Sequence, residues 1–127
     1  MKQTISAKNA FLASILKPGE MYAGILLGKD GEPDHHLILI AGQANDVTFQ
    51  QAQEFAKKSS GVLPTRREQS LLFANLKEQF DERWYWSGEK HSDTRFAWYQ
   101  HFDRGFQYGT NTFSQVRARA VRRIVIE

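Results

Sequence analysis

Two histidine–carboxylate pairs are the residues in this 127-residue chain that come closest to metal chemistry. His91 is followed two residues later by Asp93, and His101 by Asp103. On a strand, residues two apart share one face. A zinc site needs three or four ligands with supporting contacts behind them, so solvent-facing turns explain both pairs better. We therefore expect no metal and no cofactor.

The residues needed for covalent catalysis or phosphate binding are also incomplete. The chain contains no cysteine, which excludes thiol nucleophiles, disulfides and iron–sulfur clusters. Ser87 lies outside any Gly-x-Ser-x-Gly elbow and is expected in a turn after an aromatic strand. Gly24 and Gly28 precede a turn instead of a helix, so they form no phosphate-binding loop. We expect no catalytic residue and a protein that is not an enzyme.

Aromatic residues in the last third of the chain are better candidates for ligand recognition. Trp84, Trp86 and Trp98 are expected in the core, the first two on one face of a strand. Tyrosine and asparagine beside turn glycines provide rigid contact area and adaptable hydrogen bonds, as they do in antibody paratopes. The ligand-binding candidates chosen on this ground are Tyr99, His101, Phe106, Tyr108, Asn111 and Phe113.

A cluster of arginines near residue 120 is an alternative binding site. Its members are Arg117, Arg119, Arg122 and Arg123. A basic strand of this kind could contact nucleic-acid phosphates. We favour ion pairing instead, because alanine and isoleucine residues share the face of Arg122 and indicate a packed strand. The acids available for such pairs are Glu68, Glu78, Asp81 and Glu82.

The elements that must position these residues begin with a β-hairpin. Residues 4–16 have nearly helical apolar spacing, and residues 1–17 are expected to form a short helix or ordered arm. Residues 21–28 and 36–41 are β-type runs joined by a loop with Asp30-Gly31 and Pro33. Both runs are apolar on both faces, which predicts a central position for each strand.

Two helices should follow the hairpin, each with its own capping box. Thr48 and Gln51 have the spacing in which each side chain satisfies a free backbone N–H at a helix start, and this helix should end near residues 59–61. Thr65 and Glu68 repeat that spacing, and the second helix should run to about Phe80. These helices separate the hairpin from the strand-rich half.

The rest of the chain is predicted to be strands and loops. The expected strands are 84–87, 96–102, 106–110 and 117–126, with a tight turn at 103–105. A chain of this length fits one domain, and no linker or internal repeat divides it, so we assign residues 18–127 to a single α+β domain.

Four segments together resemble a known family. They are GVLPTRRE at 61–68, WYWSG at 84–88, AWYQHF at 97–102 with Gly105, and VRARAVRR at 116–123. In this order they resemble the small DUF1566-type domains of bacteriophage and prophage proteins, and they cover about half of the chain. The resemblance implies a C-type-lectin-like fold, related to formylglycine-generating enzymes and phage tropism determinants. In that fold two helices flank a sheet that joins the chain ends.

The departures from these relatives limit what the resemblance implies. Formylglycine-generating enzymes use cysteines, which are absent here, so their oxidase chemistry is not expected. Calcium-dependent lectins use a Glu-Pro-Asn or Gln-Pro-Asp triplet in late loops, whereas the similar triplet at 32–34 falls in the early hairpin and is interpreted as a turn. The region that matches the variable surface of the tropism determinants is 106–115.

We therefore expect a non-enzymatic recognition module of phage or prophage origin that binds a protein or a surface glycan through its late loops. One alternative is a small intracellular phage factor that binds a host protein or nucleic acid through the arginine cluster. Another is a structural virion or assembly component that self-associates through apolar residues of segment 1–17. We expect it in the virion or the host cytoplasm, since no signal peptide or apolar run of membrane-spanning length is present.

Overall fold

The structure is a computed structural model that describes residues 6–127, and in that range it is a mixed α+β arrangement. Its elements are α1 (Ala7–Ile15), β1 (Met21–Leu26), β2 (His35–Leu39), β3 (Ala44–Val47), α2 (Phe49–Lys58), α3 (Arg66–Leu76), the 3-10 turn η1 (Lys77–Gln79), β4 (Trp84–Lys90), β5 (Phe96–His101), β6 (Gln107–Asn111), β7 (Val116–Ala118) and β8 (Val121–Val125). The start of the expected helix, residues 4 and 5, lies outside the described range.

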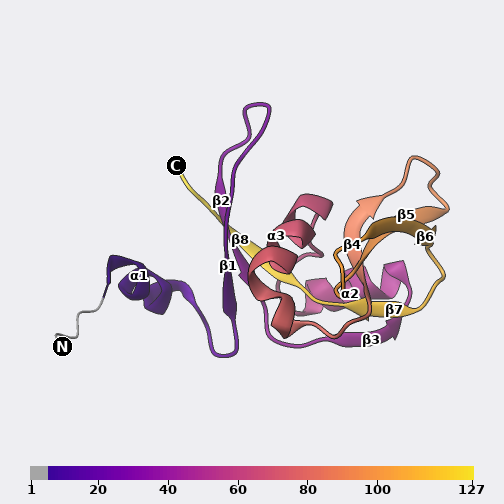
Figure 1. Cartoon of the computed structure of the whole chain (residues 1–127), viewed down its shortest axis with the longest axis horizontal. Helices are drawn as coiled ribbons and strands as arrows, with labels where there is room; N and C mark the ends of the chain where they lie inside the picture. Colours follow the sequence, from indigo (N-terminus) through magenta and orange to yellow (C-terminus); the bar gives the residue numbers. More distant parts are fainter. Residues whose placement is uncertain (1–5) are drawn as a thin grey trace.

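The strands form two sheets, and each contains strands from both halves of the chain (Figure 1). One sheet has the order β1-β2-β8, and the other has the order β3-β7-β4-β5-β6. Strand β8 runs antiparallel to β2, with His35 opposite Val125, so the end of the chain pairs with the early hairpin. The connection from β7 to β8 carries the chain from one sheet to the other.

The early hairpin is confirmed, but the predicted central position is wrong for β1. Strand β2 is central, and its Leu37, Ile38 and Leu39 are fully buried. Strand β1 forms the edge of its sheet, and Ile25 is 47% exposed. The apolar pattern did not distinguish these cases, because β8 comes from the far end of the chain to cover the second edge of β2.

Both capping boxes are present and begin the predicted helices. Thr48 accepts the N–H of Gln51, whose side chain accepts the N–H of Thr48, and Thr65 and Glu68 do the same at α3. Helix α2 packs on one face of the five-stranded sheet, and Trp86 is part of the hydrophobic core between them. Helix α3 packs between the other face and the three-stranded sheet, and Tyr85 is part of this second hydrophobic core. Adjacent residues of β4 therefore serve two separate cores.

The single strand predicted for 117–126 is wrong, since the chain forms β7 and β8 in different sheets. The crossing occurs at Arg119 and Ala120, and the Arg119 guanidinium donates to the carbonyl oxygens of Gln79 and Ile40. These contacts fix a bend in a segment whose composition is typical of a strand. Strand β3, which was not predicted, pairs with β7 next to this crossing.

The turn predicted at Ser87 is also wrong. Strand β4 continues past Ser87 to Lys90, and its register with β5 shifts between Trp86 and Lys90. The Ser87 hydroxyl is buried and donates to the carbonyl oxygen of Trp98 at 2.7 Å. This hydroxyl therefore joins two strands and is held away from solvent.

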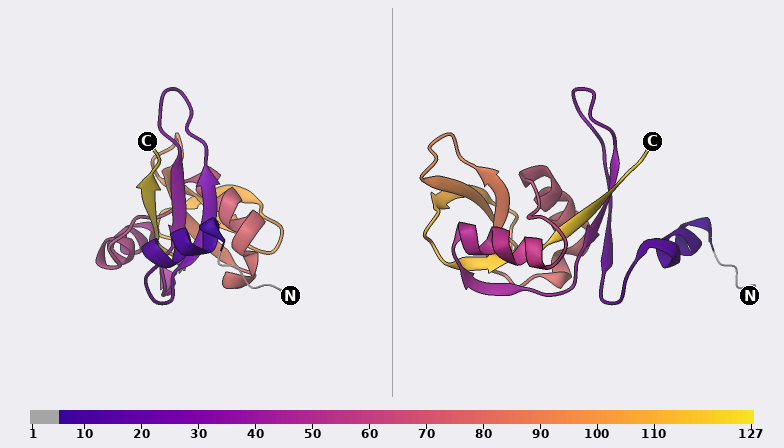
Figure 2. Two further views of the ribbon diagram at one scale, coloured as in Figure 1. Left: turned by 90° about the vertical axis from the view of Figure 1, so that its left-hand side faces the viewer. Right: turned by 180° about the vertical axis from the view of Figure 1, so that it is seen from behind.

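Helix α1 confirms the short helix expected near the start of the chain. None of its side chains is buried, and it lies beyond the three-stranded sheet, on the side away from α3 (Figure 2). The ring of Phe11 lies 4.7 Å from that of His36, and Arg122 donates to the carbonyl oxygen of Ile15. This ring contact and this hydrogen bond hold α1 against the outer face of that sheet.

Candidate functional site

Strands β4, β5 and β6 bring a group of aromatic side chains to one face of the five-stranded sheet. Trp86 is opposite Tyr99, and Tyr99 is opposite Tyr108, so these residues point to the same side. Alternation along each strand adds Trp84 and His101 to this face. We call the group Trp84, Tyr99, His101, Phe106 and Tyr108 the aromatic platform.

The rings of the aromatic platform contact one another in a continuous row. Trp84 stacks on Tyr99 with ring centroids 4.0 Å apart and an interplanar angle of 18°. His101 meets Trp84 edge-on at 4.9 Å. Tyr108 lies 6.0 Å from Trp84 and 6.2 Å from Phe106. Each ring thus packs against the next.

Much of the aromatic platform is open to solvent because α2 covers only the other end of this face. Helix α2 contacts β3, β7 and β4, and its Phe49 packs against Trp86 at 5.5 Å. Beyond Trp86, Phe106 is 52% and Tyr108 56% exposed, while Trp84, Tyr99 and His101 are half-buried. Exposed aromatic groups of this kind mark interaction surfaces more often than isolated ones do.

The structure brings together four of the six predicted ligand-binding residues: Tyr99, His101, Phe106 and Tyr108. Asn111 lies at the other end of β6, opposite Phe96, and its side chain accepts the N–H of Phe113. Phe113 is 82% exposed in that turn. These two residues therefore belong to a separate loop.

Two tryptophans expected in the core are only half-buried. Trp84 belongs to the aromatic platform. Sequence reasoning placed it in the core together with Trp86 because the two share a strand face, but only Trp86 is fully buried. Trp98 points to the opposite face, where the Arg66 guanidinium lies 3.6 Å from its ring centre. Alternation along the strand predicts the face correctly, but it cannot predict which part of a face a helix covers.

The two histidine–carboxylate pairs form turns, as expected. The Nδ1 atom of His91 accepts the N–H of Asp93, and that of His101 accepts the N–H of Asp103. Within residues 6–127, no group of three His, Cys, Asp or Glu side chains could hold a metal ion.

The arginine cluster is engaged in ion pairs and carbonyl contacts. Arg123 pairs with Glu68 and Arg117 with Asp81, and both acids were among those expected. Arg122 pairs with Glu20 instead, through two hydrogen bonds of 2.9 and 2.7 Å. Ion pairing is therefore present at Arg117, Arg122 and Arg123, with one unexpected partner, whereas Arg119 contacts only the carbonyl oxygens of Gln79 and Ile40.

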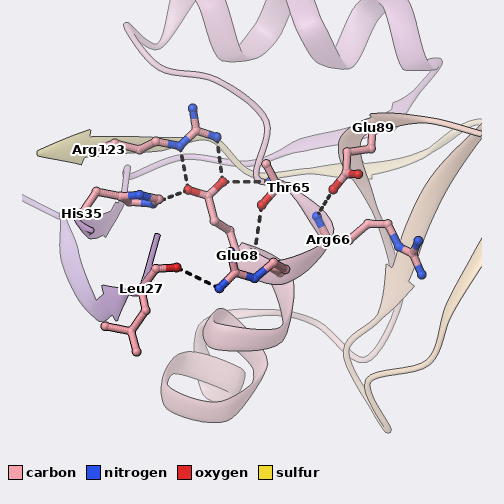
Figure 3. Close-up of polar contacts among 8 residues, drawn as sticks. Leu27, His35, Thr65, Arg66, Glu68, Glu89 and Arg123 are labelled. Atoms are coloured by element: carbon pink, nitrogen blue, oxygen red, sulfur yellow. Dashed lines mark hydrogen bonds and ion pairs between the residues drawn. The ribbon is translucent and has the colours of Figure 1, made fainter. Parts of the chain in front are cut away.

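Glu68 is the centre of a buried polar network on the other side of the five-stranded sheet (Figure 3). One carboxylate oxygen accepts the N–H of Thr65 at 2.8 Å and an Arg123 N–H at 2.7 Å. The other accepts Arg123 Nε–H at 2.6 Å and lies 2.7 Å from His35 Nε2. Sequence reasoning found Glu68 and Arg123 but missed His35, since nothing local links positions 33 residues apart.

The pKa of Glu68 follows from this network. Burial alone raises the pKa of the carboxyl group, but the hydrogen bonds from Arg123, Thr65 and His35 and the Arg123 charge outweigh it. The pKa is therefore below its ordinary value, and the Arg123 pKa is raised by the same contact. Glu68 stays ionised and has every lone pair engaged, so it holds structure in place and is poorly suited to accept a proton.

Comparison of the chain with protein-family models and with curated proteins finds no match. None of the helices in the described part of the chain has the length and apolar character needed to cross a membrane. The geometry of the aromatic platform and of the Glu68 network is therefore the basis for assigning a function.

Proposed function

We propose that this protein is a non-enzymatic recognition module that uses the aromatic platform to bind a protein or a surface glycan. The observation that carries the proposal is the exposed, mutually packed row of rings on the part of the sheet that α2 leaves uncovered. Tyrosine and tryptophan dominate binding hot spots, because they bury large areas while losing few rotamers.

The orientation of the rings suits a protein or a glycan. The stack of Trp84 and Tyr99 covers only one face of each of these rings, and the Phe106 and Tyr108 rings are tilted by 57° to one another and do not stack. Phe106 and Tyr108, each more than half exposed, are the residues we expect to become most buried.

The wider assignment to a C-type-lectin-like DUF1566-type domain of phage or prophage origin is part of the same proposal. It is supported by the order of elements, since an early hairpin, two capped helices and late strands follow one another. The pairing of β8 with β2 also joins the two ends of the domain, as the resemblance implies. On this proposal the protein acts in the virion or in the host cytoplasm.

The test compares platform variants with a matched exposed aromatic elsewhere. Phe106→Ala and Tyr108→Ala are the platform variants, and Phe113→Ala is the control because its ring is more exposed but lies in another loop. Binding of the labelled protein to a panel of bacterial cells, and to their lysates immobilised on a surface, is measured by fluorescence.

We expect both platform variants to bind about tenfold or more weakly, as at an interface hot spot, and the control to bind like the wild type. Protease treatment of the target should abolish binding if the partner is a protein, and periodate oxidation should do so if it is a glycan. Equal binding by all three variants would refute the role of the platform.

A further inference from the structure

A cavity of about 730 Å³ lies on the opposite face of β6 from the aromatic platform. Gln107 lines this cavity, whereas its neighbour Tyr108 belongs to the platform, because successive strand residues point to opposite faces. The hairpin loop at 26–33 with Val125 at the end of β8 forms one wall, and the start of α3 forms the other. This volume is within the range of small-molecule sites, roughly 300–1,000 Å³.

Two of the three carboxylates that line the cavity are already occupied. Glu68 accepts hydrogen bonds from Thr65 and Arg123 and contacts His35, as described above. Glu89 accepts the backbone N–H of Arg66 at 2.6 Å. The third carboxylate, Glu32, is on the exposed hairpin loop.

The cationic side chains of the lining retain free donors. Arg67 donates from one terminal nitrogen to the carbonyl oxygen of Leu27 at 2.9 Å. The Arg66 guanidinium lies over the Trp98 ring, and its Nε–H donates to Gln107 at 3.1 Å. Within the part of the chain that the structure describes, the other guanidinium nitrogens of both residues have no hydrogen-bond partner.

The charges of the lining therefore favour an anion. Arg123 and Glu68 neutralise one another, which leaves Lys29, Arg66 and Arg67 against Glu32 and Glu89. A guanidinium group binds carboxylate and phosphate oxygens in bidentate fashion. Arg67 points to the hairpin at Leu27, whereas Arg66 points to Trp98 and Gln107 and adds its positive charge to the lining.

The facing wall of the cavity is apolar and exposed. Leu27 is 64% and Val125 54% exposed, and Leu26 and Pro33 continue the same lining. The backbone is held in place here, because Asp34 accepts the N–H of Gly28 through its side chain and that of Ile126 through its carbonyl oxygen. The cavity thus has a cationic side on α3 and an apolar side on the hairpin.

We propose that this cavity is a second binding site, for a small organic anion that carries a carboxylate or phosphate group next to an apolar group. The anionic group contacts Arg67, whose guanidinium lies beside Leu27, and the apolar group covers Leu27 and Val125. The site is independent of the aromatic platform, since the two lie on opposite faces of the five-stranded sheet.

The test is a titration of the full chain with phenyl phosphate, followed by amide NMR shifts. We expect saturable shifts at residues 27–29, 66–67 and 125, with a dissociation constant of about 1 mM or tighter. Arg67→Gln should weaken binding about tenfold, because it removes a charged hydrogen-bond donor. Arg104→Gln, at an exposed arginine outside the cavity, should bind like the wild type.

Further arms of the titration separate the two halves of the proposal and the two sites. Val125→Thr keeps the side-chain shape, so it should weaken phenyl phosphate but leave inorganic phosphate unchanged. Tyr108→Ala should bind phenyl phosphate normally, whatever the outcome for the platform. Unsaturated shifts up to about 10 mM, or equal weakening by Arg67→Gln and Arg104→Gln, would overturn the site. Equal affinity for phenyl phosphate and inorganic phosphate would overturn its apolar half.

Discussion

Replacing Glu68 by glutamine tests whether the polar network at the start of α3 holds this helix against the three-stranded sheet. Glu68 is fully buried and joins α3 to β8 through Arg123 and to β2 through His35. Glutamine keeps the size of the side chain but removes the charge and replaces one acceptor oxygen by an amide donor. The Arg123 guanidinium then faces the amide donor of the glutamine and has lost its counter-charge.

The expected cost is about 3 kcal/mol, at the lower end of the values for breaking a buried ion pair. The lower end applies because the Arg123 side chain is 35% exposed, so water screens part of the lost interaction. For a domain of this size the loss corresponds to a decrease of roughly 10 °C in Tm. Urea unfolding followed by tryptophan fluorescence measures the free energy directly.

The pH dependence gives a second measurement of the same network. The folded-state pKa of Glu68 is lowered, so its contribution to stability is present above the unfolded pKa of about 4.3 and is lost as pH falls through the folded value. The wild type should therefore lose more stability than Glu68→Gln between about pH 6 and pH 3. Asp93→Asn is the control, since it breaks an ion pair that lies at the surface.

Two results would refute this reasoning. One is a Glu68→Gln protein with wild-type stability near neutral pH, which would mean that the network is energetically neutral. The other is an equal pH dependence in both proteins, which would mean that other carboxyl groups account for the acid sensitivity.

Two further substitutions test the core that contains Trp86 and the close approach of Gly61 to β8. Trp86→Ala should cost about 3–5 kcal/mol by urea unfolding, because it empties a fully buried site and leaves the Val47 carbonyl oxygen without its indole donor; a loss below about 1 kcal/mol would contradict this packing. Gly61→Ala should cost about 1–3 kcal/mol, because the new Cβ atom would lie 2.5 Å from the Val121 carbonyl oxygen; unchanged stability in the same assay would mean that the backbone shifts freely there.

The sequence determined the local elements well, because local contacts define them. Both capping boxes join residues three apart, and the hairpin and the turn at 103–105 depend on adjacent residues. Strand alternation also predicted that Trp84 and Trp86 share one face of their strand, which the pairing with β5 confirms. The aromatic candidates on β5 and β6 were chosen because tyrosine and asparagine lie beside turn glycines there, and four of them meet in one place because strand alternation puts them on one face.

Only the tertiary structure decided which of these surfaces are buried. Trp84 and Trp86 share a strand face, yet α2 covers Trp86 alone, and this depends on where a helix from residues 49–58 packs. The split between β7 and β8 likewise depends on carbonyl groups 40 and 79 residues away from Arg119. The cavity at α3 is bounded by segments from the beginning, middle and end of the domain. Contacts over such separations leave no periodic pattern in the sequence, so the aromatic platform, the Glu68 network and the cavity became visible only in the folded chain.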